Sequence, residues 1–214
     1  MGVIIGFSGV DGSGKTTMAD LLIEHLNQSG IDVTYHHELN RSHIMVKLIN
    51  LFAGRKRTER LKTSLFLKTN LLSNKENEFP YLSFYYLIFW LESVFLYLHF
   101  KFKKSIIISD RWPSDLIGHF KSLNFNNQII HKLFLIYPKP DFLILLSVPS
   151  QLAYSRKRHE KGHRLHNTDY YRTLQSNLLP IANNFKKCKI IDSSRPKEEV
   201  LNDVLLAIKP FITI

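Results

Sequence analysis

One stretch constrains this chain more than any other: residues 9–16, GVDGSGKT, match the pattern G-x-x-x-x-G-K-[ST] without a mismatch. The preceding residues 3–8, VIIGFS, predict a short buried strand, and residues 17–28 place apolar side chains at the spacing of one helix face. A strand, a glycine-rich turn and a helix form the setting that this motif requires. The alternative, a glycine-rich turn that binds nothing, would need all these features to coincide by chance. The sequence therefore predicts a phosphate-binding loop.

Each residue type in the loop has a chemical reason. Glycine lets the backbone approach phosphate oxygens and point several N–H groups at them. Lys15 can reach the β- and γ-phosphates of a nucleoside triphosphate, and the Thr16 hydroxyl can ligate a Mg²⁺ ion that bridges them. The residues expected to contact the triphosphate are Asp11, Gly12, Ser13, Gly14, Lys15, Thr16 and Thr17.

Length and charge limit the classes of protein. The 214 residues suit one α/β domain, residues 1–214, and are too few for two comfortable ones. A net charge of +11 suits polyanionic partners such as nucleotides, nucleic acid or an anionic membrane surface, without choosing among them. The single cysteine, Cys188, excludes an internal disulfide. Residues 1–7 lack a basic n-region, so we expect no secretory signal and a cytoplasmic location.

Polar residues follow two predicted strands. Residues 31–36 read as a second strand, and Glu38 and Arg41 lie in the loop after it. Because ligands collect at the carboxyl ends of parallel strands, both residues are candidates for binding an acceptor. A solvated pair at the start of a helix explains them equally well.

The β-branched run over residues 105–110 predicts a buried parallel strand that ends in an acid. Beside the phosphate loop, Asp110 could hold the magnesium ion or accept a proton from an attacking hydroxyl. Arg111 could bridge the donor and acceptor phosphates. Alternatively, Asp110 only caps the next helix.

The aromatic stretch at residues 79–102 is unusual because Glu92 is its only charge before Lys101. It is long enough to span a membrane, but Glu92 and several polar residues interrupt it. We expect a helix buried nearly all round. Contact with a membrane surface or a partner protein is the second interpretation, and a true span the third.

The rest of the chain completes an α/β pattern. Residues 142–148 read as a buried strand and residues 188–192 as the last strand. Five strands thus alternate with helices and predict a doubly wound parallel sheet. Two basic segments remain. Residues 55–68 predict a solvated helical face or a basic rim that attracts a phosphorylated acceptor or acidic lipid. The turn at residues 159–164 could close over a transferring phosphoryl group and exclude water.

In the order and spacing of its motifs, nearly the whole chain resembles the thymidylate kinases and their relatives, which have the P-loop NTPase fold. The residues that carry the resemblance are GVDGSGKTT, Asp110-Arg111 followed by an aromatic residue, PDFLILLSV, and Ala153-Tyr154-Ser155-Arg156. The phosphate loop is shared with many NTPases. The later motifs narrow the resemblance to the thymidylate kinases and their relatives. It implies transfer of the ATP γ-phosphoryl group, with Mg²⁺, to a nucleoside monophosphate, with dTMP as the first expectation.

The resemblance also implies roles by position. Lys15 and Thr16 would serve ATP and metal, while Asp110 and Arg111 would face the acceptor and the transferring phosphate. The remaining implied residues are Trp112 at the acceptor, Arg156 near the adenine, Arg158 and Arg164 in a short lid at about residues 156–167, and Ser193 beside the base. Relatives are commonly dimers, so we expect a homodimer. We expect no nucleic acid partner.

Three departures concern the acceptor half. Residues 37–40 stand where thymidylate-using members carry Arg-Glu-Pro-Gly. The place of the family's Asp-Arg pair falls near Glu92, where this chain has no arginine. Asp115 stands in place of the usual serine. Two rival functions therefore stay open. A kinase for a sugar or lipid-linked alcohol would explain the apolar stretch and the basic rim. A nucleotide-binding regulatory protein without transferase activity would explain the altered acceptor loop.

Overall fold

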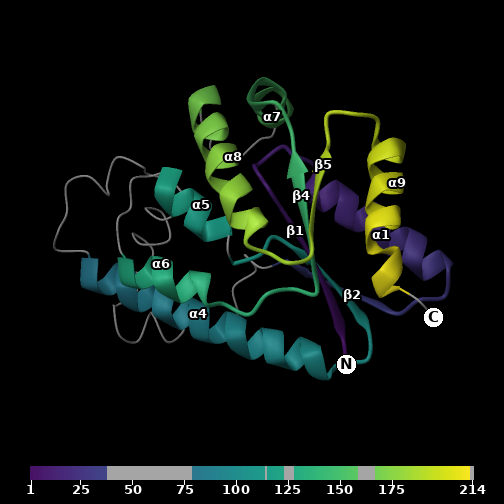
Figure 1. Cartoon of the computed structure of the whole chain (residues 1–214), viewed down its shortest axis with the longest axis horizontal. Helices are drawn as coiled ribbons and strands as arrows, with labels where there is room; N and C mark the ends of the chain where they lie inside the picture. Colours follow the sequence, from purple (N-terminus) through teal and green to yellow (C-terminus); the bar gives the residue numbers. More distant parts are fainter. Residues whose placement is uncertain (38–78, 114, 123–127, 159–166, 213–214) are drawn as a thin grey trace.

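The computed structural model describes residues 1–37, 79–113, 115–122, 128–158 and 167–212. Its centre is a five-stranded parallel sheet in the order β2-β3-β1-β4-β5 (Figure 1). The strands are β1 Val3–Gly9, β2 Val33–His37, β3 Ile106–Asp110, β4 Phe142–Ser147 and β5 Cys188–Asp192. The predicted doubly wound α/β sheet is confirmed, whereas Arg164 and most of the predicted lid lie outside the described residues.

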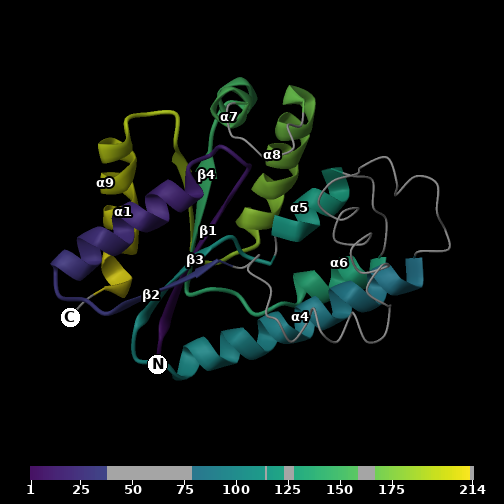
Figure 2. The ribbon, with the colours of Figure 1, turned by 180° about the vertical axis from the view of Figure 1, so that it is seen from behind.

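Helices cover both faces of this sheet. Two pack on one face, and the others lie on the opposite side, as the views from front and back show (Figures 1 and 2). The first group is α1 Lys15–Gln28 and α9 Lys197–Ile208. The second group is α4 Phe79–Phe102, α5 Asp115–Ser122, α6 Gln128–Leu135, α7 Ser150–Lys157 and α8 Thr168–Asn183.

The central strand β1 explains why there are two cores. Successive side chains of a strand point to opposite faces. Ile5 and Phe7 pack in the core beneath α1 and α9, whereas Ile4 packs in the core beneath α4, α7 and α8. Since β1, β3 and β4 are buried on both faces, their sequences are continuous apolar runs. All five carboxyl ends meet at one edge of the sheet.

Helix α1 and strand β2 have bounds that differ slightly from the expected ones. The helix begins at Lys15, within the phosphate motif. It ends in a Schellman arrangement, because Gly30, at φ 75°, donates its N–H to the Asn27 carbonyl and Ile31 donates to Leu26. These bonds occupy Ile31, so the strand starts only at Val33.

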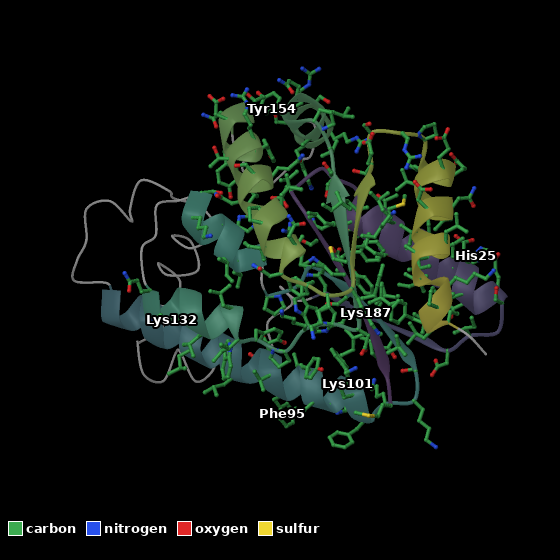
Figure 3. All side chains as sticks on the ribbon, in the orientation of Figure 1. His25, Phe95, Lys101, Lys132, Tyr154 and Lys187 are labelled. Atoms are coloured by element: carbon green, nitrogen blue, oxygen red, sulfur yellow. The ribbon has the colours of Figure 1, made fainter. Side chains whose placement is uncertain are left out.

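Helix α4 confirms the helix expected over residues 79–102, but the expectation that it is buried nearly all round is wrong. Phe95 is 71% exposed and Phe102 is 85% exposed, because α4 meets the sheet on one side only. Figure 3 shows Phe95 on the side of α4 away from the sheet. The exposed apolar residues of the helix, called the α4 stripe below, are Leu87, Leu91, Phe95, Leu98 and Phe102. Within the described residues, the search for a helix long and apolar enough to cross a membrane finds none.

Candidate functional site

The phosphate loop joins β1 to α1 at the carboxyl edge of the sheet. Gly12 has φ 82°, and a Cβ there would lie 2.5 Å from the Ala153 carbonyl oxygen, so the loop requires glycine at this position. Gly14, at φ 89°, caps α1 without a side-chain hydrogen bond, and the first turn of α1 contains no acid. The capping residue therefore supplies no side-chain acceptor, and the N–H groups of this helix start are suited to binding an anion.

Lys15 is folded back onto the loop. Its side chain is buried, and Nζ donates to the carbonyl oxygens of Gly9 at 2.9 Å and Val10 at 2.8 Å. Burial lowers the pKa of Lys15 to about 8, and the positive charge of Arg111 acts in the same direction. The ammonium is thus held beside the helix start, where it can meet a phosphate.

Asp110 lies where β3 ends, and the structure brings it to the phosphate loop as expected. Its Oδ2 accepts hydrogen bonds from Thr16 Oγ1 at 2.6 Å and from the Tyr35 hydroxyl at 3.2 Å. His37 Nε2 lies 3.9 Å from the same oxygen. The other oxygen, Oδ1, is buried and has no hydrogen-bond partner in the part of the chain that the structure describes.

Sequence reasoning missed Tyr35 and His37. Burial raises the pKa of Tyr35, with the Asp110 charge adding to the effect, and burial lowers the pKa of His37. Both residues stand at the carboxyl end of β2, beside β3. The rule that ligands gather at strand ends could have indicated them.

Arg111 adopts a backbone conformation that is rare for a residue with a side chain, at φ 81°. The Arg111 N–H donates to the Phe7 carbonyl at 3.0 Å, and Ser109 Oγ donates to the Arg111 carbonyl at 2.9 Å. The guanidinium donates to Asp11 of the phosphate loop. Burial alone would raise the pKa of Asp11, but the Arg111 and Lys15 charges hold it well below its usual range. This ion pair therefore ties the end of β3 to the phosphate loop.

A second acid, Asp115, was noticed in the sequence only as a departure from the family pattern. It is the first residue of α5 and is buried. Ser8 Oγ donates to its Oδ1 at 2.5 Å. Burial raises the pKa of Asp115 to about 6, opposed by the Ser8 hydrogen bond and by nearby cations.

Arg156 and Ser193 meet the phosphate loop from the other side. Arg156 Nη1 donates to the Gly12 carbonyl at 3.2 Å, and Nη2 donates to the Ser193 carbonyl at 3.1 Å. Ser193 is itself fixed by hydrogen bonds to the Ser147 carbonyl. The contacts place both residues near the loop, as expected, and their roles stay predictions.

Of the other expected site residues, the structure describes Trp112 and Arg158 but not the rest. Trp112 packs in the core with its ring edge-on to Tyr97 and Tyr137, at centroid distances of 6.4 and 5.6 Å. Arg158 caps the carboxyl end of α7. Glu38, Arg41, Arg164 and the basic segment 55–68 lie outside the described residues.

A magnesium ion fits the residues at the end of β3. Magnesium prefers hard oxygen ligands and usually retains water and substrate phosphates. The Thr16 hydroxyl, the Asp110 carboxylate and its unpaired Oδ1 supply such oxygens. Since the described residues contain no cluster of three His, Cys, Asp or Glu side chains suited to a metal, the remaining ligands would come from phosphate and water.

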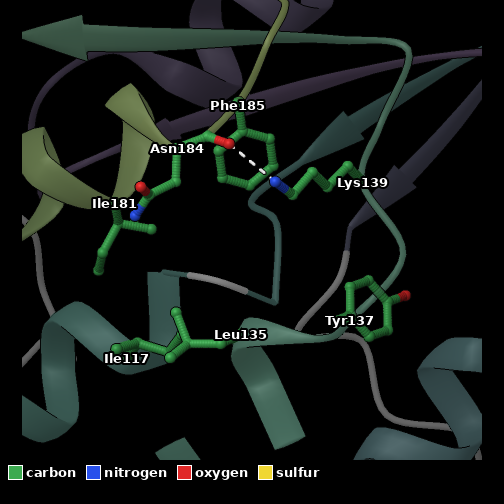
Figure 4. Close-up of a pocket in the computed structure, with 7 residues that line it drawn as sticks. All are labelled: Ile117, Leu135, Tyr137, Lys139, Ile181, Asn184 and Phe185. Carbon is green, nitrogen blue, oxygen red and sulfur yellow. Dashed lines mark hydrogen bonds between the residues drawn. The ribbon is translucent and has the colours of Figure 1, made fainter. Parts of the chain in front are cut away.

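A cavity of about 370 Å³ lies among α5, α6 and α8 (Figure 4). Lys139 Nζ lies at its wall and donates to the Asn184 carbonyl at 2.7 Å. The lining residues are Ile117, Leu135, Tyr137, Lys139, Ile181, Asn184 and Phe185. None of them is an expected site residue, and the cavity's cation is explained by its bond to the end of α8.

Comparison with known proteins finds relatives of matching length. The chain is 27% identical over 214 residues to a probable thymidylate kinase of Archaeoglobus fulgidus, covering 99% of this chain and 97% of that protein. It is also 27% identical over 208 residues to probable thymidylate kinase 1 of Saccharolobus solfataricus, covering 96% of each. Over nearly its whole length, the chain is thus similar to probable thymidylate kinases. The suspected resemblance is thus confirmed.

The comparison with solved structures supports the fold. The crystal structure of thymidylate kinase from Ehrlichia chaffeensis matches with a TM-score of 0.62 and 19% identity, over 97% of this chain and 98% of that one. At this identity the match shows the fold alone. The search against protein-family models gave no match.

Proposed function

We propose that this chain is an ATP-dependent thymidylate kinase that transfers the γ-phosphoryl group of ATP to dTMP. Its relatives of matching length carry that name. The observation that carries the proposal is the meeting of Thr16, Asp110 and the Arg111–Asp11 pair at the phosphate loop. This arrangement supports the proposal, because groups that bind the donor and groups that face the acceptor would then lie on adjoining strand ends. Neither rival function has support in the comparisons.

Phosphoryl transfer needs positioning and charge stabilisation more than covalent chemistry by the protein. The N–H groups at the start of α1 and the Lys15 ammonium bind the ATP phosphates. Thr16 and Asp110 would hold Mg²⁺, which supplies neutralising charge between the phosphates. Arg111, anchored by Asp11, faces the transferring group, and Arg156 positions the donor end of the site.

The proposal extends to the arrangement of the protein. The chain acts as one kinase domain, residues 1–214, with a lid at about residues 156–167 that contributes Arg158 and Arg164. Glu38, Arg41 and Trp112 bind the acceptor. Two copies pair through the α4 stripe, since a continuous exposed apolar surface on a helix marks an interaction site. The protein works in the cytoplasm.

An acceptor panel tests the proposed function. ADP release from ATP and Mg²⁺ is measured with dTMP, dUMP, dCMP, dGMP, thymidine and a set of sugars. We expect turnover to be fastest with dTMP. Turnover with a sugar alone would favour the non-nucleotide kinase, and ATP binding without turnover of any acceptor would favour the regulatory protein.

The variant Lys15→Ala checks that the turnover belongs to this site. Its loss of phosphate stabilisation should lower kcat by about 10²–10³-fold or more, as removal of one charge-stabilising donor does elsewhere. Lys132→Ala, which removes an exposed lysine of α6, is the matched control and should keep the wild-type rate. Full activity in Lys15→Ala would contradict the proposed site.

A further inference from the structure

Asp115 carries a feature that folding alone does not explain. Its carboxyl is buried, and its Oδ2 has no hydrogen-bond partner in the described part of the chain. Burying a carboxylate with an unsatisfied oxygen is unfavourable, so such groups in native structures are usually retained for a reason other than stability. Oδ2 is itself covered from solvent. Asp115 therefore acts through its neighbours rather than by touching a substrate.

Its neighbours link the two halves of the site. Ser8, which donates to Asp115, immediately precedes the Gly9 carbonyl that accepts from Lys15. Asp115 also begins α5 four residues after Arg111, and its N–H donates to the Trp112 carbonyl at 2.8 Å. The Ser8–Asp115 bond thus joins the strand that leads into the phosphate loop to the segment that carries Arg111.

The charges around Asp115 belong to the same machinery. Lys15 and Arg111 both attract its carboxylate, whereas Asp110 repels it. Lys15 and Arg111 thus lie among three acids. The acids are Asp110, Asp115 and Asp11, and Asp11 pairs with Arg111. An acid at this place balances the two cations without occupying the position of a phosphate.

We propose that Asp115 is a positioning residue for phosphoryl transfer: anchored by Ser8, its buried carboxyl holds Lys15 and Arg111 in the arrangement that the transferring phosphate requires. This inference rests on the proposed function and adds a residue that stands where the family pattern has serine. The raised pKa of Asp115, caused by burial, agrees with a carboxyl whose charge is costly to the fold.

The test compares three variants at neutral pH. Asp115→Asn keeps an oxygen for the Ser8 hydroxyl but removes the charge. Ser8→Ala removes the hydrogen bond but keeps the charge. Asp203→Asn, on α9, is the matched control, because it makes the same chemical change at an acid that pairs with Arg195. For each variant, kcat and KM for ATP and dTMP are measured with the melting temperature.

Asp115→Asn should lower kcat by about 10–100-fold, the usual cost of losing an outer partner that orients a reactive group. Its KM for ATP should stay the same or fall, because a charge that repels phosphate has been removed. Its melting temperature should not fall. Ser8→Ala should lose kcat to a smaller degree, and Asp203→Asn should not lose it at all.

A well-folded Asp115→Asn with kcat within about twofold of wild type overturns the inference, given the 10–100-fold loss expected of a positioning residue. A loss of kcat that only follows a lower melting temperature overturns it too, because the role is then structural. If the wild-type protein turns over no acceptor, the proposed function fails separately. An active wild-type protein beside an unimpaired Asp115→Asn overturns the inference alone.

Discussion

Buried charge is concentrated at one edge of this molecule. The side chains of Lys15, Asp110 and Asp115 are largely covered by the protein, and each belongs to the group around the phosphate loop. Burying ionised groups is unfavourable unless they are paired. The strained backbone of Arg111 lies in the same place, held by hydrogen bonds on both sides. The residues proposed to serve the chemistry thus include groups whose burial or backbone conformation is unfavourable for stability.

The effect of the buried Asp115 carboxyl on stability can be measured. Its folded pKa of about 6 lies above the ordinary value of 3.8, so the folded protein retains a proton that the unfolded chain has lost. Its contribution to the free energy of unfolding therefore falls as pH rises from about 4 to about 6. Relative to wild type, Asp115→Asn should gain stability across this window, up to about 3 kcal/mol, because one pKa unit corresponds to about 1.4 kcal/mol.

Urea unfolding of both proteins at several pH values measures the difference. The effects of groups that titrate alike in both proteins cancel in this comparison. A constant difference between pH 4 and 7 would contradict the raised pKa.

Sequence reasoning found some residues of the site and missed others for a physical reason. Lys15 and Thr16 follow from a local motif, and Asp110 ends a run of apolar residues that marks a strand. The contact of Tyr35 with Asp110 depends instead on how β2 pairs with β3, where Tyr35 lies opposite Ile108. This register joins segments about seventy residues apart and is set by tertiary packing. Ser8 and Asp115 depend on such packing as well.

At the scale of elements, the sheet and its helices were predictable because strands and helices differ in their hydrophobic period. Helix α4 shows the limit of that reasoning. Its composition reveals that it is apolar, but not how many of its sides other elements cover. The sheet side holds Phe100 and the buried Ser93, and Lys101 binds Asp141 before β4. The α4 stripe faces away from these contacts.

The proposed pairing through the α4 stripe can be tested at Phe95, which is 71% exposed in the single chain. Phe95→Glu should convert a wild-type dimer into a monomer, since a charge would be buried at the interface. Light scattering after size-exclusion chromatography measures the mass. Leu206→Glu, at an equally exposed residue of α9, should remain dimeric. A monomeric wild type, or a dimeric Phe95→Glu, would refute the pairing.

At the scale of the whole molecule, ligand binding should be visible as stability. A ligand at a concentration of 100 times its Kd adds about 2.7 kcal/mol to the free energy of unfolding. For a chain of this size, that corresponds to a rise in Tm of about 5–10 °C. ATP with Mg²⁺ should give this shift in a thermal melt, and EDTA should reduce it. Lys15→Ala should show little shift, and an equal shift in that variant would argue for binding elsewhere.

The pairing of β1 has a consequence for how the protein is made. Both neighbours of this strand come late in the chain: Val3 pairs with Ile106, and Ile5 pairs with Phe142. At a synthesis rate of about 5–20 residues per second, the ribosome needs on the order of ten seconds to deliver the second neighbour. During that time the hydrophobic strand β1 cannot pair with both of its neighbours in the sheet. Shielding of this segment by chaperones would therefore be most useful early in translation.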